Sequence, residues 1–244
     1  MHLLFLLTIC LISVIINAQS FDAGKKRKYE VVLIGLVLFL FAALRDTTVG
    51  IDIPGYVKNY EKIGKYSFGE IMILKEGRDP VFSIFCKLLT YISDSPQFML
   101  AVVGAIVAIS FSYYVYHQKC NVLLLYILFI SFRLFAFTLT GLRQAIALSL
   151  CWIAFVMMQK GKNFKFFALT ALASLFHTSA IVSVLVWCFY KFGKPKTSFF
   201  VCAGISAVDL SLNHALVFLF SELMAEDRFE IYMNADALTE YSGG

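Results

Sequence analysis

Charged residues are scarce in this sequence. Asp, Glu, Lys and Arg together make up 15% of the 244 residues, whereas 60% are hydrophobic, and the mean hydropathy is +0.79. A water-soluble domain of this composition would expose more apolar surface than its few charges can keep in solution. The composition therefore predicts an all-α, polytopic membrane helix bundle, which we expect to form a single transmembrane domain over residues 1–244.

The sequence also lacks the short motifs of metal and disulfide sites. It contains no C-x-x-C pair, no H-x-x-x-H or H-E-x-x-H pattern and no D-x-D pattern. The six cysteines lie in or beside apolar stretches, where cysteine is typically a small packing residue: Cys10, Cys86, Cys120, Cys151, Cys188 and Cys202. We therefore predict no metal site, no disulfide framework and no cofactor.

The net charge of +5 does not indicate a nucleic-acid partner, because the lysines cluster in short loops at the ends of apolar runs. Cytoplasmic loops of membrane proteins carry such an excess of Lys and Arg. Assigning the clusters at 25–28, 117–119, 160–165 and 191–196 to the cytoplasm gives a consistent topology. The N-terminus and the polar segment 45–80 are then expected outside.

The apolar runs predict about eight or nine membrane segments, several of them short. The expected spans are 3–21, 29–44, 98–116, 122–138, 142–158, 164–176, 179–190 and 199–220. The run 81–92 is about twelve residues long and contains Lys87, so it is too short to cross comfortably and is expected to be interfacial or re-entrant. If it did cross, three of the four lysine-rich loops would lie outside, against the usual bias.

The segment 45–80 is the longest polar stretch and forms the expected external loop. Within it Tyr56, Tyr60 and Ile63 recur at helical spacing between lysines, which predicts a short amphipathic helix on the membrane surface. The tyrosines either belong to an interfacial aromatic belt or stack on a sugar face.

Arg143 stands between two strongly apolar runs. A guanidinium near the hydrocarbon is costly, so it usually faces a wet cavity or a binding site. Arg143 is therefore either the centre of a site or a snorkelling anchor at a helix end. Arg133, part-way along the preceding run, is interpreted as structural.

A polar interruption at His177, Thr178 and Ser179 divides a run of about 27 apolar residues, 164–190, that has cations at both ends. This pattern predicts a hairpin of two short helices that turns at His177. His177 is either a functional group or only the cap of a tight turn, whose neighbours supply hydrogen bonds to the freed backbone.

Three segments together resemble a known family. They read R-D-T-T-V-G-I-D-I-P-G-Y at 45–56, G-L-R-Q-A-I-A-L-S-L at 141–150 and S-L-F-H-T-S-A-I at 174–181. Their order and spacing are similar to those of the EpsG family of bacterial membrane proteins, which belongs to the Wzy-like polysaccharide polymerases. The resemblance covers about residues 30–195. Because members of that family continue through further membrane helices, we expect this chain to be a fragment or a short member.

The resemblance implies polymerisation of lipid-linked oligosaccharide repeat units in exopolysaccharide, capsule or O-antigen biosynthesis. The reaction would be glycosyl transfer from a polyprenyl-pyrophosphate donor, such as undecaprenyl pyrophosphate, at the outer face of the cytoplasmic membrane. The matching positions are Arg45, Asp52 and Tyr56 in the first motif, Arg143 and Gln144 in the second, and His177 in the third. Without a D-x-D pattern, we expect a metal-independent glycosyltransferase.

These residue types suit that chemistry. Fixed guanidinium groups stabilise negative charge that develops on a leaving pyrophosphate, which favours Arg143 and Arg45 as donor-binding residues. A neutral histidine, with an ordinary pKa near ~6.5, can accept the proton of an acceptor hydroxyl, which favours His177 as the base. Asp52 is the competing base, the group that orients the acceptor, or only a turn residue. Tyr56 and Gln144 are expected to bind the saccharide or the pyrophosphate.

Two other functions stay open. A flippase for the lipid-linked unit would also need intramembrane charge and a broken helix, but here the charges gather at one face and no inverted repeat is evident. A membrane acyltransferase using an embedded histidine would not require paired external arginines. The expected partners are the lipid-linked oligosaccharide, membrane lipids and other polysaccharide-assembly proteins, and the expected location is the bacterial cytoplasmic membrane, with several spans.

Overall fold

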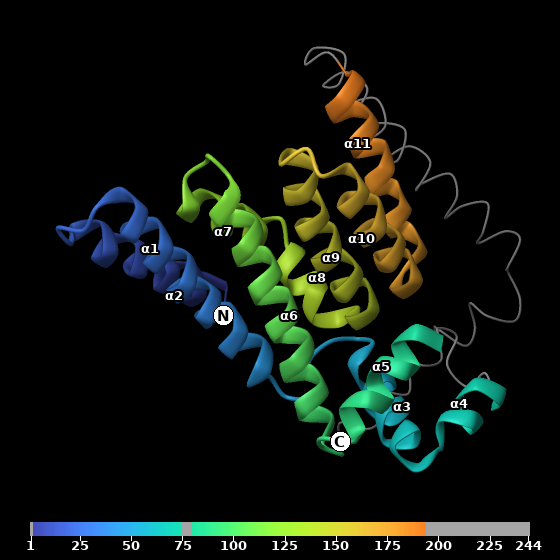
Figure 1. Cartoon of the computed structure of the whole chain (residues 1–244). Helices are drawn as coiled ribbons and strands as arrows, with labels where there is room; N and C mark the ends of the chain where they lie inside the picture. The colour runs from blue at the N-terminus through green and yellow to red at the C-terminus, as the bar shows by residue number, and fades with distance from the viewer. Residues whose placement is uncertain (1, 75–79, 194–244) are drawn as a thin grey trace, which may run out of the picture. The chain divides into compact units, whose positions relative to one another are not determined.

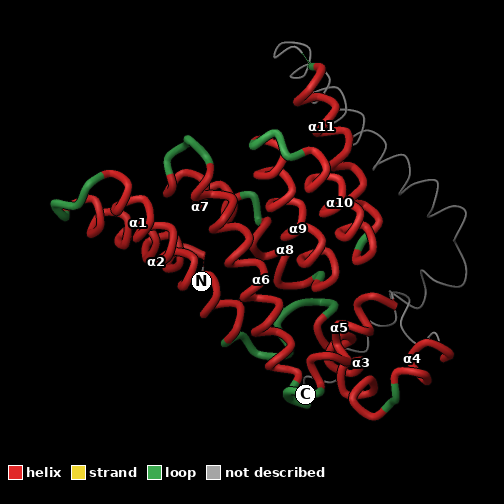
Figure 2. Tube along the Cα trace, in the orientation of Figure 1, coloured by secondary structure: helices red, strands yellow, loops and turns green. Residues whose placement is uncertain are grey.

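The computed structural model describes residues 2–74 and 80–193. Every regular element in this part of the chain is a helix, and it contains no strand (Figure 2). In order they are α1 (His2–Ala18), α2 (Ala23–Ala43), α3 (Ile53–Lys65), α4 (Phe68–Leu74), α5 (Pro80–Thr90), α6 (Pro96–His117), α7 (Val122–Ser131), α8 (Leu134–Thr140), α9 (Leu142–Gln159), α10 (Asn163–Phe176), the 3-10 helix η1 (Thr178–Val182) and α11 (Ser183–Phe192). The prediction of an all-helical fold is confirmed for these residues, and the predicted span 199–220 lies outside them.

Two of these helices, α6 and α9, are long and apolar enough to cross a membrane. Together α7 and α8 pass the same test, but they are bent by 57° at the break between them. The described residues also form shorter apolar helices, among them α5, α10 and the segment 178–192. The predicted count of eight or nine membrane segments therefore stays a prediction.

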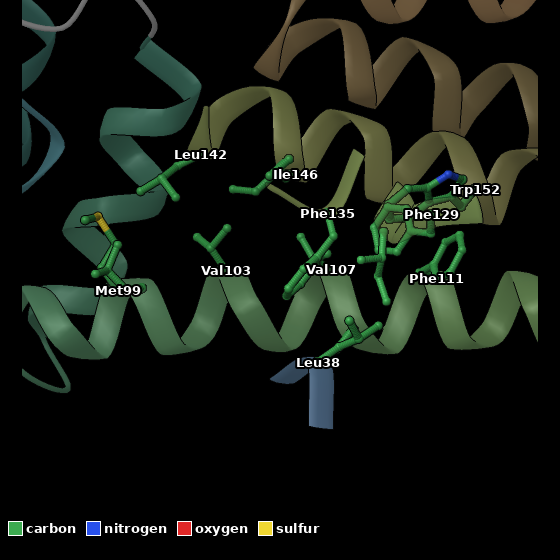
Figure 3. Packing of buried hydrophobic residues seen from close by; sticks show 14 of the residues in the cluster. Leu38, Met99, Val103, Val107, Phe111, Phe129, Phe135, Leu142, Ile146 and Trp152 are labelled. Atoms are coloured by element: carbon green, nitrogen blue, oxygen red, sulfur yellow. The ribbon is translucent and has the colours of Figure 1, made fainter. Parts of the chain in front are cut away.

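The largest hydrophobic core is built around α6, which packs against both α2 and α9 (Figure 1). Apolar side chains cover all faces of α6, so it is suited to contact other helices on some faces and lipid on others. Figure 3 shows Val103 and Val107 of α6 facing Leu142 and Ile146 of α9. This packing fixes the first turn of α9 against α6.

Small residues let α2 and α6 approach closely. A Cβ added at Gly104 would lie 2.7 Å from the Cβ of Ala42, and one added at Gly35 would overlap the Oγ of Ser112. Such contacts between small residues are the usual way for membrane helices to pack tightly. Near the end of the pair, the Gln97 side-chain amide donates to the carbonyls of Ala43 and Arg45. The loop that leaves α2 is therefore tied to the start of α6.

The sequence predicted that the cationic cluster 25–28 forms a loop, but the structure shows that it does not. It lies in the first turns of α2, because Asp22 caps this helix by accepting a hydrogen bond from the Lys25 backbone N–H at 2.9 Å. Within the cluster, the Arg27 guanidinium donates to backbone carbonyls at the end of α6 and just beyond it, including that of Val115 at 2.6 Å. The cluster therefore contributes to helix packing as well as to charge asymmetry.

The expected span 122–138 is not one continuous helix, and whether the bent pair crosses the membrane stays a prediction. The chain breaks between α7 and α8, and Arg133 adopts a left-handed conformation with φ 59°. A left-handed residue cannot continue an α-helix, so α8 begins in a new direction. It ends at Thr140, and Gly141 separates it from α9.

The amphipathic helix expected in the polar loop is present as α3, but its apolar face packs on protein. Tyr60 and Ile63 are buried, and the Tyr60 hydroxyl donates to the Ser93 carbonyl at 2.7 Å. The Lys87 ammonium of α5 donates to the Gly64 carbonyl at 3.2 Å and so caps the end of α3. Tyr60 therefore neither stacks on a sugar nor belongs to an interfacial belt.

The run expected to be interfacial or re-entrant is α5. Its eleven residues extend about 16 Å, roughly half the thickness of a bilayer core. The side chains of Phe82, Cys86 and Leu89 are buried in the main core, whereas Tyr91 and Ile92, just after α5, are exposed. Whether this segment enters the membrane stays a prediction.

The chain reverses at His177. The Trp187 indole N–H of α11 donates to the Asn163 side-chain oxygen at the start of α10, at 3.1 Å, and its ring contacts that of Phe167. A residue in the middle of α11 thus lies beside the beginning of α10, as in the hairpin that the polar interruption predicts.

Candidate functional site

The first turn of α9 is where the three sequence motifs meet. Gly141 precedes this helix, is buried and provides no side-chain cap. The N-terminal end of an α-helix carries a partial positive charge and free backbone N–H groups, which together favour anions. Arg143 adds a full positive charge to the same turn.

Arg143 binds a side chain of the first motif. Its Nε donates to the Tyr56 hydroxyl at 3.2 Å, and its guanidinium carbon lies 5.9 Å from the centre of the Tyr56 ring. Both side chains are half-buried. The tyrosine therefore orients the guanidinium, a contact that a simple snorkelling anchor does not require.

Gln144 binds the histidine of the third motif. Its side-chain nitrogen lies 3.2 Å from the Nε2 of His177. In this orientation the amide donates to a neutral imidazole that carries its proton on Nδ1; with the amide turned over, its oxygen would accept from Nε2–H and leave Nδ1 as the acceptor. A Cβ at Gly141 would lie 2.7 Å from the Gln144 amide oxygen. Because glycine has no side chain, position 141 leaves room for the Gln144 side-chain amide.

The backbone of His177 has a structural role too. His177 caps α10, its N–H donates to the Ala173 carbonyl at 3.0 Å, and its own carbonyl accepts from Ala180 at 3.0 Å. The turn-cap alternative is therefore correct for the backbone, while the imidazole is directed to Gln144.

Arg45 connects the first motif to the residues just before the second. It donates to the Leu139 carbonyl through Nη1. Burial lowers the pKa of Arg45 to about 10, so it stays charged at neutral pH. Its Nε is buried and has no hydrogen-bond partner in the part of the chain that the structure describes.

The loop after Arg45 packs against the end of α8 at Gly50. This glycine has φ +116°, and a Cβ there would lie 2.9 Å from Ile53 and 3.2 Å from Thr140. Only glycine fits this conformation and this space. The turn therefore holds the 45–53 segment beside the residues that lead into α9.

Asp52 lies apart from these contacts. It precedes α3, its carboxylate is exposed and does not cap the helix, and only its backbone carbonyl accepts from the Tyr56 N–H at 3.2 Å. The structure shows no hydrogen bond between Asp52 and His177. The two predicted candidates for the base are thus not brought together.

A row of aromatic rings from α5 connects the two sides of the site. The ring of Tyr56 contacts Phe82 at 5.4 Å between centroids, Phe82 contacts Phe85 at 6.0 Å, and Phe85 contacts Phe176, the neighbour of His177, at 6.3 Å. The sequence alone did not indicate that α5 belongs to the site, because its short apolar run is typical of an interfacial or re-entrant segment. The three-residue spacing of its phenylalanines, typical of one helix face, was the available signal.

A cavity of about 280 Å³ lies beside the Gln144 side chain, between α8, α9 and the segment from η1 to α11. Its walls are mainly apolar and include Phe137 and Phe155, with Gln144, Ser179 and Ser183 adding polar atoms. Gln144, which contacts His177, is therefore part of the wall of this cavity.

These features define a helical membrane protein with a cationic, anion-attracting helix start beside a histidine. The chain belongs to the EpsG family, whose sequence model matches residues 28–243. The resemblance found in the three motifs is thereby confirmed, over a longer stretch than those motifs cover. None of the curated proteins and none of the solved structures matches. Membership indicates a polysaccharide-polymerase-like membrane protein with a lipid-linked sugar as substrate.

Proposed function

We propose that the protein is a Wzy-like glycosyltransferase that joins lipid-linked oligosaccharide repeats at the outer face of the bacterial cytoplasmic membrane. The observation that carries this proposal is the arrangement around α9. The consecutive residues Arg143 and Gln144 bind Tyr56 and His177, which come from the other two family motifs. One helical turn therefore carries a cation for a leaving pyrophosphate and the residue that binds the candidate base.

Arg143 and the start of α9 would bind the pyrophosphate of the donor. Guanidinium groups and helix N-termini both stabilise phosphate oxygens, and their effect grows as negative charge accumulates on the leaving group. Tyr56 orients Arg143 and offers a ring for a sugar face. Arg45 adds a second fixed positive charge next to Leu139, and it also positions the loop.

In the transfer, an acceptor hydroxyl oxygen forms a bond to the anomeric carbon of the donor. The bond from that carbon to the phosphate oxygen breaks, and its electron pair leaves with the carrier pyrophosphate. The hydroxyl proton moves to His177, which requires Gln144 to accept from Nε2–H so that Nδ1 keeps its lone pair. Asp52, at the exposed start of α3, would orient the acceptor. No metal ion takes part in these steps.

The proposal is tested by the size distribution of lipid-linked saccharide in cells that carry the intact gene, a deletion, Arg143→Ala or Arg143→Lys, combined with labelling from outside the cell. We expect both variants to reduce the ladder to a single repeat that is still labelled from outside. Lysine lacks the planar guanidinium that can form two parallel hydrogen bonds to a phosphate. Arg143→Lys should therefore lower polymer formation on the order of 10²-fold. Arg133→Ala, at membrane levels matched to the variants, is the control and should keep the full ladder.

Two other outcomes have definite meanings. A single repeat that cannot be labelled from outside would show that transport has failed, which would support the flippase alternative. An unchanged ladder in Arg143→Ala would leave the family assignment intact and return Arg143 to the role of a helix-end anchor.

A further inference from the structure

An open apolar groove of about 780 Å³ runs between α2 and α6, outside the site described above. Its walls are formed by side chains such as Val32, Leu36 and Phe39 of α2, with Ala105 and Ile109 of α6 opposite. The exposed fractions of Leu36 and Ile109 are 48% and 69%. A groove of this composition matches a hydrocarbon chain and offers little to a polar ligand.

One end of the groove is polar and positively charged. Lys28, Tyr113 and Tyr116 line it, and Lys28 is exposed and forms no ion pair with any residue in the described part of the chain. The ammonium of Lys160 lies 3.5 Å from the Tyr113 hydroxyl. Glu30, the carboxylate nearest in sequence, is buried and accepts a hydrogen bond from Ser13 of α1.

The length of the groove matches one leaflet of a bilayer. From Lys28 to Phe39, α2 advances about 16 Å, and half of a hydrocarbon core is about 15 Å. A chain that begins at the charged end would therefore reach the other end of the groove at about the membrane midplane.

We propose that this groove holds an acyl chain of an anionic phospholipid, whose phosphate binds Lys28 and the tyrosine hydroxyls. Charge complementarity selects an anionic headgroup, since two ammonium groups lie at this end and no carboxylate is among the described residues that line the groove. The headgroup site is separate from the proposed donor site, because the α2 backbone advances about 22 Å from Lys28 to Ala43, just before Arg45. The lipid site therefore does not depend on the proposed function.

The test uses the purified full-length protein in nanodiscs of phosphatidylcholine that contain a photoactivatable phosphatidylglycerol with its reactive group on the acyl chain. Mass spectrometry of the cross-linked peptides identifies the labelled helices. We expect labels on α2 and α6, and a loss of labelling of at least about fivefold in Ala105→Phe, which fills the groove. Lys28→Gln should weaken labelling about fivefold, the contribution of one lysine near a charged lipid surface.

Matched controls separate these effects from a general disturbance. Ala171→Phe changes an exposed alanine of α10, and Lys119→Gln removes a cation near the same end of α6 that does not line the groove; both should keep full labelling. Ile109→Trp fills the groove from an exposed position, so it tests the proposal even if Ala105→Phe fails to fold.

Three results would overturn the proposal. Equal labelling by a photoactivatable phosphatidylcholine would show that the groove does not select an anionic headgroup. Undiminished labelling of α2 and α6 in both groove-filling variants would place the lipid elsewhere. Displacement of the probe by an equimolar polyprenyl phosphate would identify the carrier lipid as the occupant instead.

Discussion

Arg143 and Gln144 are neighbours in sequence, but they bind different parts of the protein. Successive residues of an α-helix point about 100° apart around its axis, so Arg143 is directed to Tyr56 of α3 and Gln144 to His177 after α10. The first turn of α9 is therefore expected to contribute both to donor binding and to proton transfer. Substitutions at Arg143 should act on donor binding, and substitutions at Gln144 should act on proton transfer.

The Gln144–His177 contact predicts a change in pH dependence for Gln144→Glu. A carboxylate at this position accepts from Nε2–H and favours the positively charged imidazolium. If His177 must be neutral to accept a proton, activity on the acid side is lost at a higher pH in the variant than in the wild type. The rate of polymer formation by membrane vesicles, measured between about pH 5 and about pH 9, tests this.

Gln118→Glu is the control for this experiment, because Gln118 lies after α6 and pairs with Gln159 instead. Its pH profile should coincide with that of the wild type. An unshifted profile for an active Gln144→Glu protein would show that His177 does not accept the proton.

At the scale of single elements, the break between α7 and α8 requires a left-handed residue at Arg133. A residue with a Cβ pays about 1–2 kcal/mol for this conformation, whereas glycine does not. Glycine also has more conformational entropy in the unfolded chain, which offsets part of this gain. Arg133→Gly should therefore raise the free energy of unfolding by about 1 kcal/mol. The apparent Tm in detergent should rise by about 2–4 °C.

Arg133→Ala is the matched variant, since it removes the same charge and keeps the cost of the left-handed conformation. Its Tm should stay near that of the wild type. Equal Tm values for the Gly and Ala variants would show that the side chain, rather than the backbone conformation, determines the effect.

The α3 helix is held by a buried tyrosine whose ionisation should loosen it. Burial raises the pKa of Tyr60 to about 12, from the ordinary value of about 10. Because the folded protein favours the neutral phenol, the contribution of Tyr60 to stability is complete below about pH 10 and is lost as the pH rises toward about 12. Tyr60→Phe should lower stability at neutral pH by about 1 kcal/mol, through loss of the bond to Ser93.

Thermal unfolding followed by circular dichroism at about pH 8 and about pH 11 tests this expectation. The difference between wild type and Tyr60→Phe should shrink at the higher pH. Tyr91→Phe changes an exposed ring just after α5 and serves as the control. A difference that stays constant with pH would mean that folding does not raise the pKa of Tyr60.

At the scale of the whole molecule, the contact between Arg27 and the end of α6 joins segments about ninety residues apart. The guanidinium satisfies carbonyls that the end of a helix leaves without partners, and its charge complements the helix dipole. Arg27→Gln should therefore destabilise the protein by about 2 kcal/mol. Lys119→Gln, which removes a charge from the same region without removing such bonds, should leave the apparent Tm unchanged, and an equal loss in both would indicate a general charge effect.

Local properties of the sequence were enough to predict the helical membrane class, the family and the residues of the three motifs. Apolar composition, the distribution of lysines and the spacing of motifs are visible in short windows, and none of them depends on packing. For the same reason the sequence predicted the turn at His177 and the amphipathic pattern of α3. It could not show that Tyr60 and Ile63 face protein, since an apolar helix face is equally suited to lipid.

Only the tertiary structure decided which of these residues meet. Tyr56 and Arg143 are 87 positions apart, and Gln144 and His177 are 33 apart. Their contacts therefore depend on tertiary packing, in which α5 contacts both α3 and α10, and α10 packs on α9. The same packing binds Arg45 to Leu139 and leaves Asp52 exposed, although both belong to one motif. The break at Arg133 is also a tertiary outcome, because the apolar pattern of 122–138 by itself favours a continuous helix. Packing among distant helices is set by side-chain shape and close approach, and a local pattern of residue types does not contain that information.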